Sequence, residues 1–518
     1  MAGLDLINSI GTWVMKKRIH QIELFLKYPH EVQLDTFRKL IHEARDTEFG
    51  RKYEYATIDT VEKYRERVPL QSYEDIVPYV ERLMRGEQNI LWPSEIKWFS
   101  KSSGTTNARS KFIPVSYEAL EECHFAGGKD LISIHVNNYE GSRLFSGKNL
   151  SIGGSSQLNP FDEEHGDSYL GDVSAVITKN LPLWVQVIRT PNLEIALMDE
   201  WESKIEAMAN YTIDQDVVSM SGVPTWTLVL IQRLLEMKGV DSILDVWPNL
   251  ELFAHGAVSF TPYRSLFKEL IPSDNMDYLE TYNASEGFFG LQDQRGSDEL
   301  LLMLDYGIYY EFIPMSEWGK ENPETIGLDQ VEKGKNYALV ISTNAGLWRY
   351  LIGDTIRFTS IKPYRIHISG RTKHFINAFG EEVIVENAET AITRACEATG
   401  ATLDNFTAAP RYLAQGQKGG HEWVIEFQRL PDDLHRFRTL LDETLREVNS
   451  DYDAKRHRDI ALEAPVVHAV SQGTFYEWMR KRGKLGGQNK VPRLSNTREY
   501  LDDLLKMIEE QGRRLEQL

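Results

Sequence analysis

The sequence predicts an α/β protein with two domains. The large N-terminal domain contains β-sheets flanked by helices and a β-rich, barrel-like section, and a smaller α+β domain follows it. Three observations support this fold class. The chain has 518 residues, more than the ~250–300 residues at which a single core stops growing. Strand and helix patterns alternate through its middle. The pattern changes near Arg371, so we place the domains at 1–372 and 373–518.

The first hundred residues are predicted to be mainly helical. Within region 1–50, apolar residues recur at the spacing of one helix face: Val32, Phe37, Leu40, Ile41 and Ala44. A second helix is predicted over 74–85, where Pro78 fits only near the first turn. An apolar run at 96–100 then predicts a strand, and a further helix is expected from Tyr117.

The middle of the chain alternates short apolar strands with amphipathic helices, as α/β folds do. Strands are predicted at 217–221, 250–253 and 277–281, and helices at 224–237 and 263–270. The β-rich section has predicted strands at 300–304, 308–313, 337–342, 349–351 and 355–359. The C-terminal domain combines predicted helices at 383–395, 432–448 and 497–509 with strands at 423–428 and 466–470.

Composition excludes several classes of function. The formal net charge of −19 argues against nucleic acid as a partner, because phosphate backbones are bound by clustered Lys and Arg. No stretch approaches the ~20 apolar residues of a membrane span. Cys123 and Cys396 form no metal-ligand pattern and are expected to be core residues of a reduced protein. We therefore expect a cytoplasmic protein that binds neither membrane nor nucleic acid.

The segment 101–111 predicts a phosphate-binding loop. Its small residues are Ser102, Ser103, Gly104, Thr105 and Thr106, and Lys111 closes it. Backbone N–H groups and hydroxyls can surround a polyphosphate while a lysine neutralises its charge. The predicted strand before the loop and helix after it favour such a site. The loop matches neither the Walker A nor the dinucleotide pattern, and a Ser/Thr-rich surface turn is the alternative.

Two carboxylates follow predicted strands. Glu286 lies beyond the strand at 277–281, where a carboxylate is well placed to hold Mg²⁺. The alternative is a helix N-terminus capped by Ser285. Asp354 follows Gly353 at a predicted turn between strands, where its carboxylate can accept both ribose hydroxyls. The alternative there is a plain hairpin turn.

Two glycine-containing segments lie in the last third of the chain. Gly370 and Gly380 flank the change of pattern and allow the unusual backbone angles that a hinge requires. A charged surface hairpin is the alternative. The segment 484–493 contains paired glycines and places Lys490 shortly before Pro492. A mobile lysine there can reach a phosphate, and a solvated loop is the alternative.

In this order, the segments resemble the adenylate-forming superfamily of acyl-CoA ligases, luciferases and peptide-synthetase adenylation domains. The loop, with Asn107-Ala108-Arg109-Ser110 before its lysine, is most similar to that of the acyl-acid amido synthetases. These are the plant enzymes that conjugate auxin or jasmonate, and their bacterial relatives. The strings at 282–287, 309–314, 350–354 and 488–493 support the same family, and the resemblance covers nearly the whole chain.

The resemblance implies specific site residues. Nucleotide contacts are implied for Ser102, Ser103, Gly104, Thr105, Thr106, Tyr282, Ser285, Asp354 and Arg371. Catalytic roles are implied for Lys111, for Glu286, which would hold Mg²⁺, and for Lys490, which would enter from a mobile C-terminal lid. The acyl-substrate pocket would include Val223, Pro224 and Trp226.

The implied activity is a two-step ligation with ATP and Mg²⁺. A small carboxylic acid is first converted to an acyl-adenylate, and an amine, that of an amino acid, then takes the acyl group. The alternatives are an acyl-CoA ligase with the same first step and a non-catalytic nucleotide-binding regulator. Many superfamily members have a second Gly where this chain has Asn107-Ala108, which favours the amido synthetases. The identity of the acid, the acceptor, the base of the second step and the oligomeric state stay open.

Overall fold

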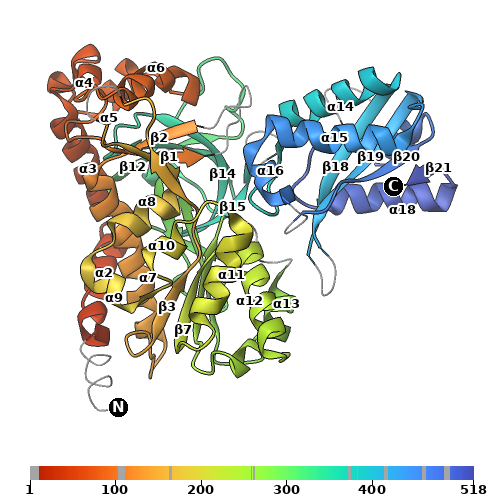
Figure 1. Ribbon diagram of the computed structural model, residues 1–518. Helices are drawn as coiled ribbons and strands as arrows, with labels where there is room; N and C mark the ends of the chain where they lie inside the picture. Colours follow the sequence, from red (N-terminus) through yellow and green to blue (C-terminus); the bar gives the residue numbers. More distant parts are fainter. Residues whose placement is uncertain are drawn as a thin grey trace.

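The computed structural model describes residues 11–102, 111–162, 166–257, 260, 263–371, 375–381, 383–413, 418–457, 462–482 and 491–517. Figure 1 shows a larger body, coloured red to green, and a smaller blue body beside it. The two bodies meet near the strand β15 (Tyr364–Arg371) and the helix α16 (Ser450–Arg456). The chain is therefore a large mixed α/β unit followed by a smaller unit, as the sequence predicts.

The N-terminal helices cover one end of the larger body. They are α2 (Ile19–Lys27), α3 (Pro29–Ala44), α4 (Glu48–Lys52), α5 (Val61–Arg67) and α6 (Tyr73–Met84). The helix α3 buries the predicted face that includes Phe37 and Leu40. Pro78 lies in the second turn of α6, so its restriction to the first turn was wrong. The carbonyl left without a helix donor belongs to Glu74, an exposed residue whose carbonyl can bond to water.

One sheet of eleven strands organises the larger body, in the order β12-β13-β14-β15-β11-β10-β9-β8-β7-β3-β6. Its parallel half comprises β3 (Lys148–Ser151), β6 (Arg189–Thr190), β7 (Val217–Gly222), β8 (Leu252–Gly256) and β9 (Asp277–Ala284). Its antiparallel half comprises β10 (Gly287–Leu291), β11 (Leu300–Leu302), β12 (Ile308–Pro314), β13 (Asn336–Thr343), β14 (Tyr350–Ile361) and β15. The carboxyl ends of the parallel strands therefore meet at one edge.

Helices cover both faces of the parallel half. On one face, α11 (Trp201–Thr212), α12 (Pro224–Lys238) and α13 (Arg264–Leu270) pack on residues such as Leu150, Met220 and Phe253. On the other lie α7 (Phe125–Asn138), α8 (Val173–Asn180) and α9 (Leu183–Ile188), with Leu252 and Leu279 in the apolar cluster beneath α7. Strand residues that alternate between the two faces are therefore buried beneath helices on both sides.

The predicted β-rich section is the antiparallel end of this open sheet rather than a barrel-like unit, because β12 forms one edge of the sheet. The predicted strands at 349–351 and 355–359 are parts of one strand, β14. Gly353 has φ +94° inside that strand, so the expected turn between two strands was wrong there. Glycine adopts this angle without the clash of a Cβ, which lets the strand continue on either side.

A second sheet has the order β2-β1-β5-β4. Its strands are β1 (Trp98–Ser102), β2 (Lys111–Val115), β4 (Ser156–Leu158) and β5 (Tyr169–Asp172). The strands β1 and β2 pair antiparallel, with Ser102 opposite Lys111. The predicted phosphate-binding loop thus joins two strands. The order predicted for it, a strand, the loop and then a helix, was wrong. The apolar run that starts at Phe112 forms β2 before any helix begins.

The smaller body contains β18 (Thr402–Arg411), β19 (Gly420–Arg429), β20 (Val466–Val470) and β21 (Arg514–Gln517) in one sheet. Its helices are α14 (Val385–Thr399), α15 (Leu434–Val448), α16, α17 (Thr474–Lys481) and α18 (Glu499–Gln511). The predicted helix at 383–395 starts two residues later, because Val383 and Ile384 pair with Phe375 and Ile376 as β17 and β16. The division at 372/373 stays a prediction.

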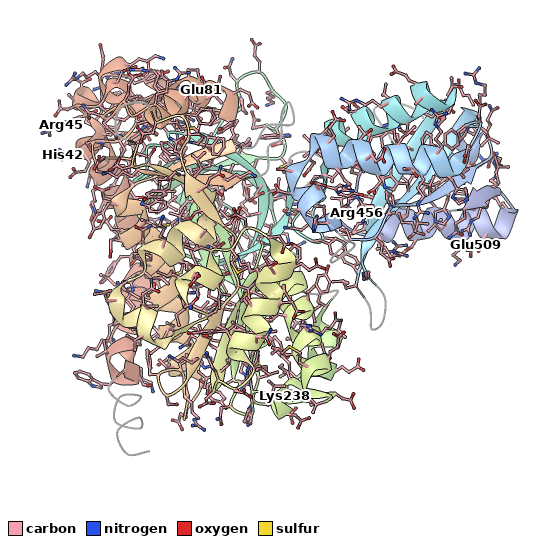
Figure 2. The ribbon with its side chains drawn as sticks, viewed as in Figure 1. His42, Arg45, Glu81, Lys238, Arg456 and Glu509 are labelled. Carbon is pink, nitrogen blue, oxygen red and sulfur yellow. The ribbon has the colours of Figure 1, made fainter. Side chains whose placement is uncertain are left out.

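Direct contacts join the two bodies. The Tyr263 hydroxyl donates a hydrogen bond to the Ala378 carbonyl, 2.8 Å away. The Lys455 ammonium lies 4.5 Å from the centre of the Trp226 ring. Figure 2 shows Arg456, on α16, at the end of the smaller body that approaches the larger one, whereas Glu509 lies at its far end. The helix α16 thus brings side chains of the C-terminal body to the larger one.

Candidate functional site

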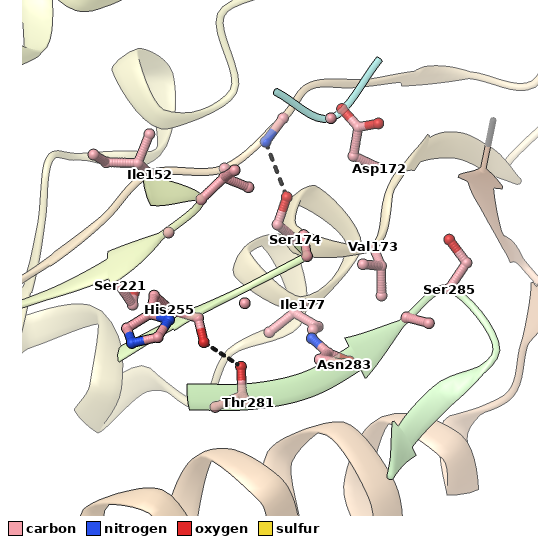
Figure 3. Close-up of a pocket in the computed structure, with 18 of the residues that line it drawn as sticks. Ile152, Asp172, Val173, Ser174, Ile177, Ser221, His255, Thr281, Asn283 and Ser285 are labelled. Atoms are coloured by element: carbon pink, nitrogen blue, oxygen red, sulfur yellow. Dashed lines mark hydrogen bonds between the residues drawn. The ribbon is translucent and has the colours of Figure 1, made fainter. Parts of the chain in front are cut away.

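A cavity of about 1710 Å³ lies beyond the carboxyl ends of the parallel strands and continues between the helices and the sheet. Eight predicted site residues line it: Ser102, Lys111, Val223, Trp226, Tyr282, Ser285, Glu286 and Asp354. Figure 3 shows its centre, where Val173, Ser174 and Ile177 of α8 surround the space with residues of β7, β8 and β9. Ligands of open α/β sheets bind at this edge.

The turn between β9 and β10 joins the second sheet through serine side chains. The Ser100 hydroxyl donates to the Ser285 Oγ at 2.9 Å, and the Ser285 hydroxyl lies 3.4 Å from the Lys101 carbonyl. Ser285 therefore sits in a turn between strands, and the helix N-terminus considered for it does not occur. These contacts place Glu286 beside β1, the strand that precedes the predicted phosphate-binding loop.

Tyr282 on β9 and Asp354 on β14 form a side-chain link between the two halves of the large sheet. The Tyr282 hydroxyl donates to Asp354 Oδ2 at 2.5 Å, and both residues are buried. A hydrogen bond to a charged carboxylate is stronger than one between neutral groups. The bond from Tyr282 therefore fixes the Asp354 carboxylate at the cavity wall. The same bond sets the direction of the other carboxylate oxygen, Oδ1.

Lys111 is buried, and its ammonium lies 5.5 Å from the centre of the Tyr73 ring. The Tyr73 hydroxyl accepts a hydrogen bond from the Phe112 N–H at 2.7 Å. Burial raises the pKa of Tyr73 to about 12, and the negative charge of Glu286 contributes to the same rise. The positive charge of Lys111 and the negative charge of Glu286 therefore both act on the region around Tyr73.

The part of the cavity beneath α7, α8 and α9 has a polar floor and apolar walls. The floor includes Ser151, Ser219 and Ser221, which lie on β3 and β7. Apolar helix residues form the walls: Leu131, Ile132, Ile177, Leu181, Val185 and Ile188. Val223 and Trp226 line the other side, whereas Pro224 begins α12 and is absent from the described lining residues. This compartment suits an elongated acid with an apolar middle.

The titratable groups of the cavity are shifted by burial. Burial lowers the pKa of His255 to about 3 and that of His124 to about 4. His255 stacks on Phe260, with ring centres 4.0 Å apart, and accepts a bond from Thr281 only through its backbone carbonyl. A group with so low a pKa is neutral at pH 7 and a weak base. His255 thus fits a structural role better than a catalytic one.

Burial also raises the pKa of Glu280 to about 7, although the positive charge of Arg264 acts against the rise. Glu280 and Arg264 both line the cavity. Shifts of this size concentrate at functional sites, and sequence inspection missed both residues. Their local signal is weak, because Glu280 occurs inside an apparently regular strand.

The C-terminal body contributes a cation that sequence inspection missed. Lys455 lines the cavity near Trp226, and burial lowers its pKa although Asp451 and Asp172 are close enough to raise it. Asp172 also lines the cavity, and its Oδ2 accepts a bond from the Ser155 N–H at 3.1 Å. Asp172 is the last residue of β5 and directly precedes α8, and the sequence analysis predicted no strand at that position. Lys455 carries no local signal.

Several predicted residues cannot be placed. Ser103, Gly104, Thr105, Thr106 and Lys490 lie outside the described residues. Arg371 is the last residue of β15, opposite Asp354 in the strand register. Its backbone thus adjoins the cavity wall, and its side chain is not among those described.

The string at 309–314 has a structural explanation. Glu311 is buried in β12 and forms ion pairs with Arg349 at 3.0 Å and with Arg65 at 2.9 Å. The pairs tie the antiparallel half of the sheet to α5, away from the cavity. A motif that supports a family resemblance is here part of the core.

Family models match most of the chain in the order that its architecture suggests. Residues 18–276 match the GH3 family N-terminal domain, 301–371 its central domain and 386–499 its C-terminal domain. The chain belongs to the GH3 family. The N-terminal match covers β1, β2 and most of the parallel half, and the central match covers the antiparallel strands from β12 to β15.

Similarity to individual GH3 proteins is low but extends over nearly the full length. The indole-3-acetic acid-amido synthetase GH3.8 of Oryza sativa subsp. indica is 25% identical, with 83% of this chain and 82% of the relative aligned. The 4-substituted benzoates-glutamate ligase GH3.12 of Arabidopsis thaliana is 24% identical, with 89% and 92% aligned. A solved structure of the GH3.15 acyl acid amido synthetase in complex with 2,4-DB has a TM-score of 0.59 at 17% identity, covering 94% of both chains. The last comparison shows a shared fold.

None of the helices in the described ranges combines the length and apolar composition needed to cross a bilayer. Cys123 is buried, and Cys396 is partly buried against the C-terminal core. Burial raises the pKa of the Cys123 thiol to about 12, and its sulfur accepts the Phe288 N–H at 3.1 Å. The prediction that the cysteines are packing residues is confirmed for Cys123.

Proposed function

We propose that this GH3 protein is an acyl-acid amido synthetase that uses ATP to activate a small carboxylic acid and transfers the acyl group to an amino acid. The observation that carries the proposal is the convergence of Ser102, Lys111, Glu286 and the Tyr282–Asp354 pair on one cavity. These residues come from two sheets, and the family resemblance implies nucleotide contacts or catalytic roles for each of them. Relatives that are named for such activities, including GH3.8 and GH3.12, support the same reaction class.

The first step joins two anions, so charge repulsion is its main obstacle. The acid carboxylate attacks the α-phosphorus of ATP, pyrophosphate leaves, and an acyl-adenylate remains. Lys111 neutralises phosphate charge, and Asp354, held by Tyr282, accepts the ribose hydroxyls and fixes the nucleotide. Ser102 and the loop after it provide hydrogen-bond donors to the triphosphate. These preorganised charges and donors lower the barrier without a covalent enzyme intermediate.

Glu286 fits a Mg²⁺ site, because Mg²⁺ in ATP-dependent enzymes takes one or two carboxylates together with substrate phosphates. Its side chain and that of Lys111 line the same cavity. When bound, the ion supplies charge neutralisation for the triphosphate.

The second step needs the adenylate and an amine in the same cavity. The amino group attacks the activated carbonyl and AMP leaves, so an amide bond replaces the mixed anhydride. In our proposal, residues 373–518 form a mobile lid on an adenylation domain of residues 1–372, and Lys490 enters from the lid for the first step. The proposal places the protein in the cytoplasm, and its two unpaired cysteines support a reducing compartment.

The test is acid-dependent exchange of pyrophosphate into ATP over a panel of carboxylic acids. We expect exchange that requires both Mg²⁺ and one class of acid. The reaction is then repeated with an amino-acid mixture or with CoA, and the product is weighed by mass spectrometry. An amide product supports the proposal, and a thioester would make the protein a CoA ligase. Binding of ATP with no exchange on any acid would indicate a nucleotide-binding regulator instead.

A further inference from the structure

Arg189 lines the cavity from the edge of the large sheet, four strands along from β9, which carries Tyr282. It belongs to the edge strand β6 and pairs with Asn149 of β3, which in turn pairs with Ser219 of β7. Register partners on parallel strands point to the same face of the sheet. The row of Arg189, Asn149 and Ser219 therefore faces α7, α8 and α9, and all three residues line the cavity.

The guanidinium of Arg189 is buried, and none of the described residues gives it a counter-charge. The residue is 7% exposed, and its Nη1 is buried with no hydrogen-bond partner. In the part of the chain that the structure describes, its single hydrogen bond is a long one from Nε to Gln186 Oε1, at 3.5 Å. Burial lowers its pKa, and among the described residues the group that acts against this is the Tyr211 hydroxyl rather than a carboxylate.

The polar neighbours of Arg189 are already satisfied by other groups. The Ser219 hydroxyl donates to Asn149 Oδ1 at 2.6 Å, and Asn149 Nδ2 donates to the Leu144 carbonyl at 3.1 Å. Neither residue offers a negative charge. A buried cation without a partner costs several kcal/mol, and a ligand anion would remove that cost.

The depth of the compartment sets the position of this anion. Gly222, the last residue of β7, lies three positions after Ser219, so the row lies ~10 Å below the strand ends. The walls between these levels are apolar and include Ile177, Leu181 and Ile188. The compartment thus has an apolar middle, a cation at its base and the nucleotide residues at its mouth.

From this geometry we propose that Arg189 binds a second carboxylate of the acyl substrate, which is therefore a dicarboxylic acid with an apolar spacer. One carboxylate lies at the strand ends and reacts with ATP, and the other pairs with the Arg189 guanidinium. The inference rests on the proposed function for the reacting carboxylate. Arg189 itself recognises the substrate and takes no part in bond formation.

The test compares α,ω-dicarboxylic acids of about seven to ten carbons, matched to the ~10 Å depth, with monocarboxylic acids and ω-hydroxy acids of equal length. Binding to the full-length protein is measured by calorimetry without ATP, and activation by pyrophosphate exchange. We expect the wild type to prefer a diacid over the matched monoacid by about 10²-fold in both. Arg189→Met should abolish this preference, and Arg189→Lys should retain part of it.

Two further measurements separate recognition from folding. Arg189→Met should unfold at the same or a higher temperature than the wild type when no ligand is present, because it removes an uncompensated buried charge. The diacid should raise the unfolding temperature of the wild type but not of this variant. Arg233→Met, which removes an exposed arginine paired with Glu206 and Glu236, should keep the diacid preference.

The outcomes are distinguishable. Equal binding of diacid and monoacid, equal binding of the ω-hydroxy acid, or a preference that survives in Arg189→Met would overturn the inference. Diacid binding that depends on Arg189 but supports no pyrophosphate exchange would support the subsite and contradict the proposed function. Pyrophosphate exchange with monoacids alone would support the proposed function and contradict the subsite.

Discussion

At the scale of single residues, the cavity depends on buried polar groups whose partners come from distant parts of the chain. Asp354 is held by Tyr282 across 72 residues of sequence, and Ser285 by Ser100 across 185. A buried carboxylate that loses a donor keeps its desolvation cost. Each such pair therefore affects both stability and the orientation of the group that meets the substrate.

Removal of the Tyr282 hydroxyl tests the role of Asp354. Tyr282→Phe leaves the Asp354 carboxylate without its 2.5 Å donor, so the ribose should be bound in a less defined position. We expect the KM for ATP in pyrophosphate exchange to rise about 10-fold, as for loss of a hydrogen bond to a charged group. The matched control is Tyr310→Phe, which removes another buried hydroxyl bonded to the Met303 carbonyl. The control should lower the unfolding temperature and leave this KM unchanged, and an equal rise in both variants would contradict the assignment.

Glu280 predicts a dependence of stability on pH. Its pKa is about 7 in the folded protein, against an ordinary value of 4.5. Between these values the folded state binds more protons than the unfolded state, so the free energy of unfolding falls as the pH rises. Glu280→Gln removes this cost, and we expect its unfolding temperature to exceed that of the wild type by roughly 2 °C at pH 8, with no gain near pH 4.5. Glu269→Gln, at an exposed position of α13, should show the same difference at both pH values. A gain from Glu280→Gln that is independent of pH would refute the linkage.

At the scale of elements, the site residues are placed by turns and irregular positions in strands. The turn between β9 and β10 holds Ser285 and Glu286, and β14 carries Asp354 directly after Gly353. The strand β14 also changes register against β15 between Thr355 and Ile356. Such irregularities re-aim a side chain within a sheet, and here they turn Asp354 toward Tyr282.

A substitution at Gly353 tests this placement. Its φ of +94° is unfavourable for any residue with a Cβ, so Gly353→Ala should cost about 1–2 kcal/mol of stability and displace Asp354. We expect a lower unfolding temperature and a KM for ATP raised about 10-fold, as for loss of one charged hydrogen bond. Gly334→Ala, at φ +83° with no atom within 4 Å of the added Cβ, should lower stability similarly but leave the KM for ATP as in the wild type. If both variants changed the KM alike, the irregular strand would not be what positions Asp354.

At the scale of the whole molecule, the cavity is shared by the two bodies. Lys455, Tyr412 and Asn496 line it from the C-terminal side, and Tyr412 donates to the Asn496 carbonyl at 2.6 Å. The Asn377 N–H bonds to the Asn496 side chain at 2.8 Å beside the junction of the bodies. A change in the position of the smaller body would therefore alter the residues presented to the substrate.

The proposed lid predicts that the two half-reactions respond differently to Lys490. Lys490→Ala should slow pyrophosphate exchange by roughly 10²–10³, the usual effect of losing one charge-stabilising contact. Transfer from a preformed acyl-adenylate to the amine should be affected much less. Lys481→Ala, an exposed lysine of the same body, should leave both half-reactions unchanged. Equal losses in both half-reactions for Lys490→Ala would remove its proposed role.

The order of the motifs and the class of the fold could be predicted because they depend on local patterns. The alternation of short apolar strands with amphipathic helices indicates an α/β fold. The phosphate-binding loop, Glu286 and Asp354 are recognisable from their neighbours in sequence. Strand continuity was harder to predict. The break expected near Gly353 does not occur, because pairing with β13 and β15 outweighs the turn preference of glycine and aspartate.

The sequence alone therefore determined the family, the likeness of its loops to a nucleotide site, and the change of architecture near Arg371. The tertiary structure alone decided which side chains meet: Tyr282 with Asp354, Lys111 near Tyr73, and Lys455 over Trp226. It also decided that Arg189 is buried with no counter-charge from the described part of the chain. The physical reason is that hydrogen bonding, burial and charge act between atoms a few ångströms apart. Most of those atoms belong to residues separated by tens or hundreds of positions. Local sequence patterns do not encode contacts between such distant residues.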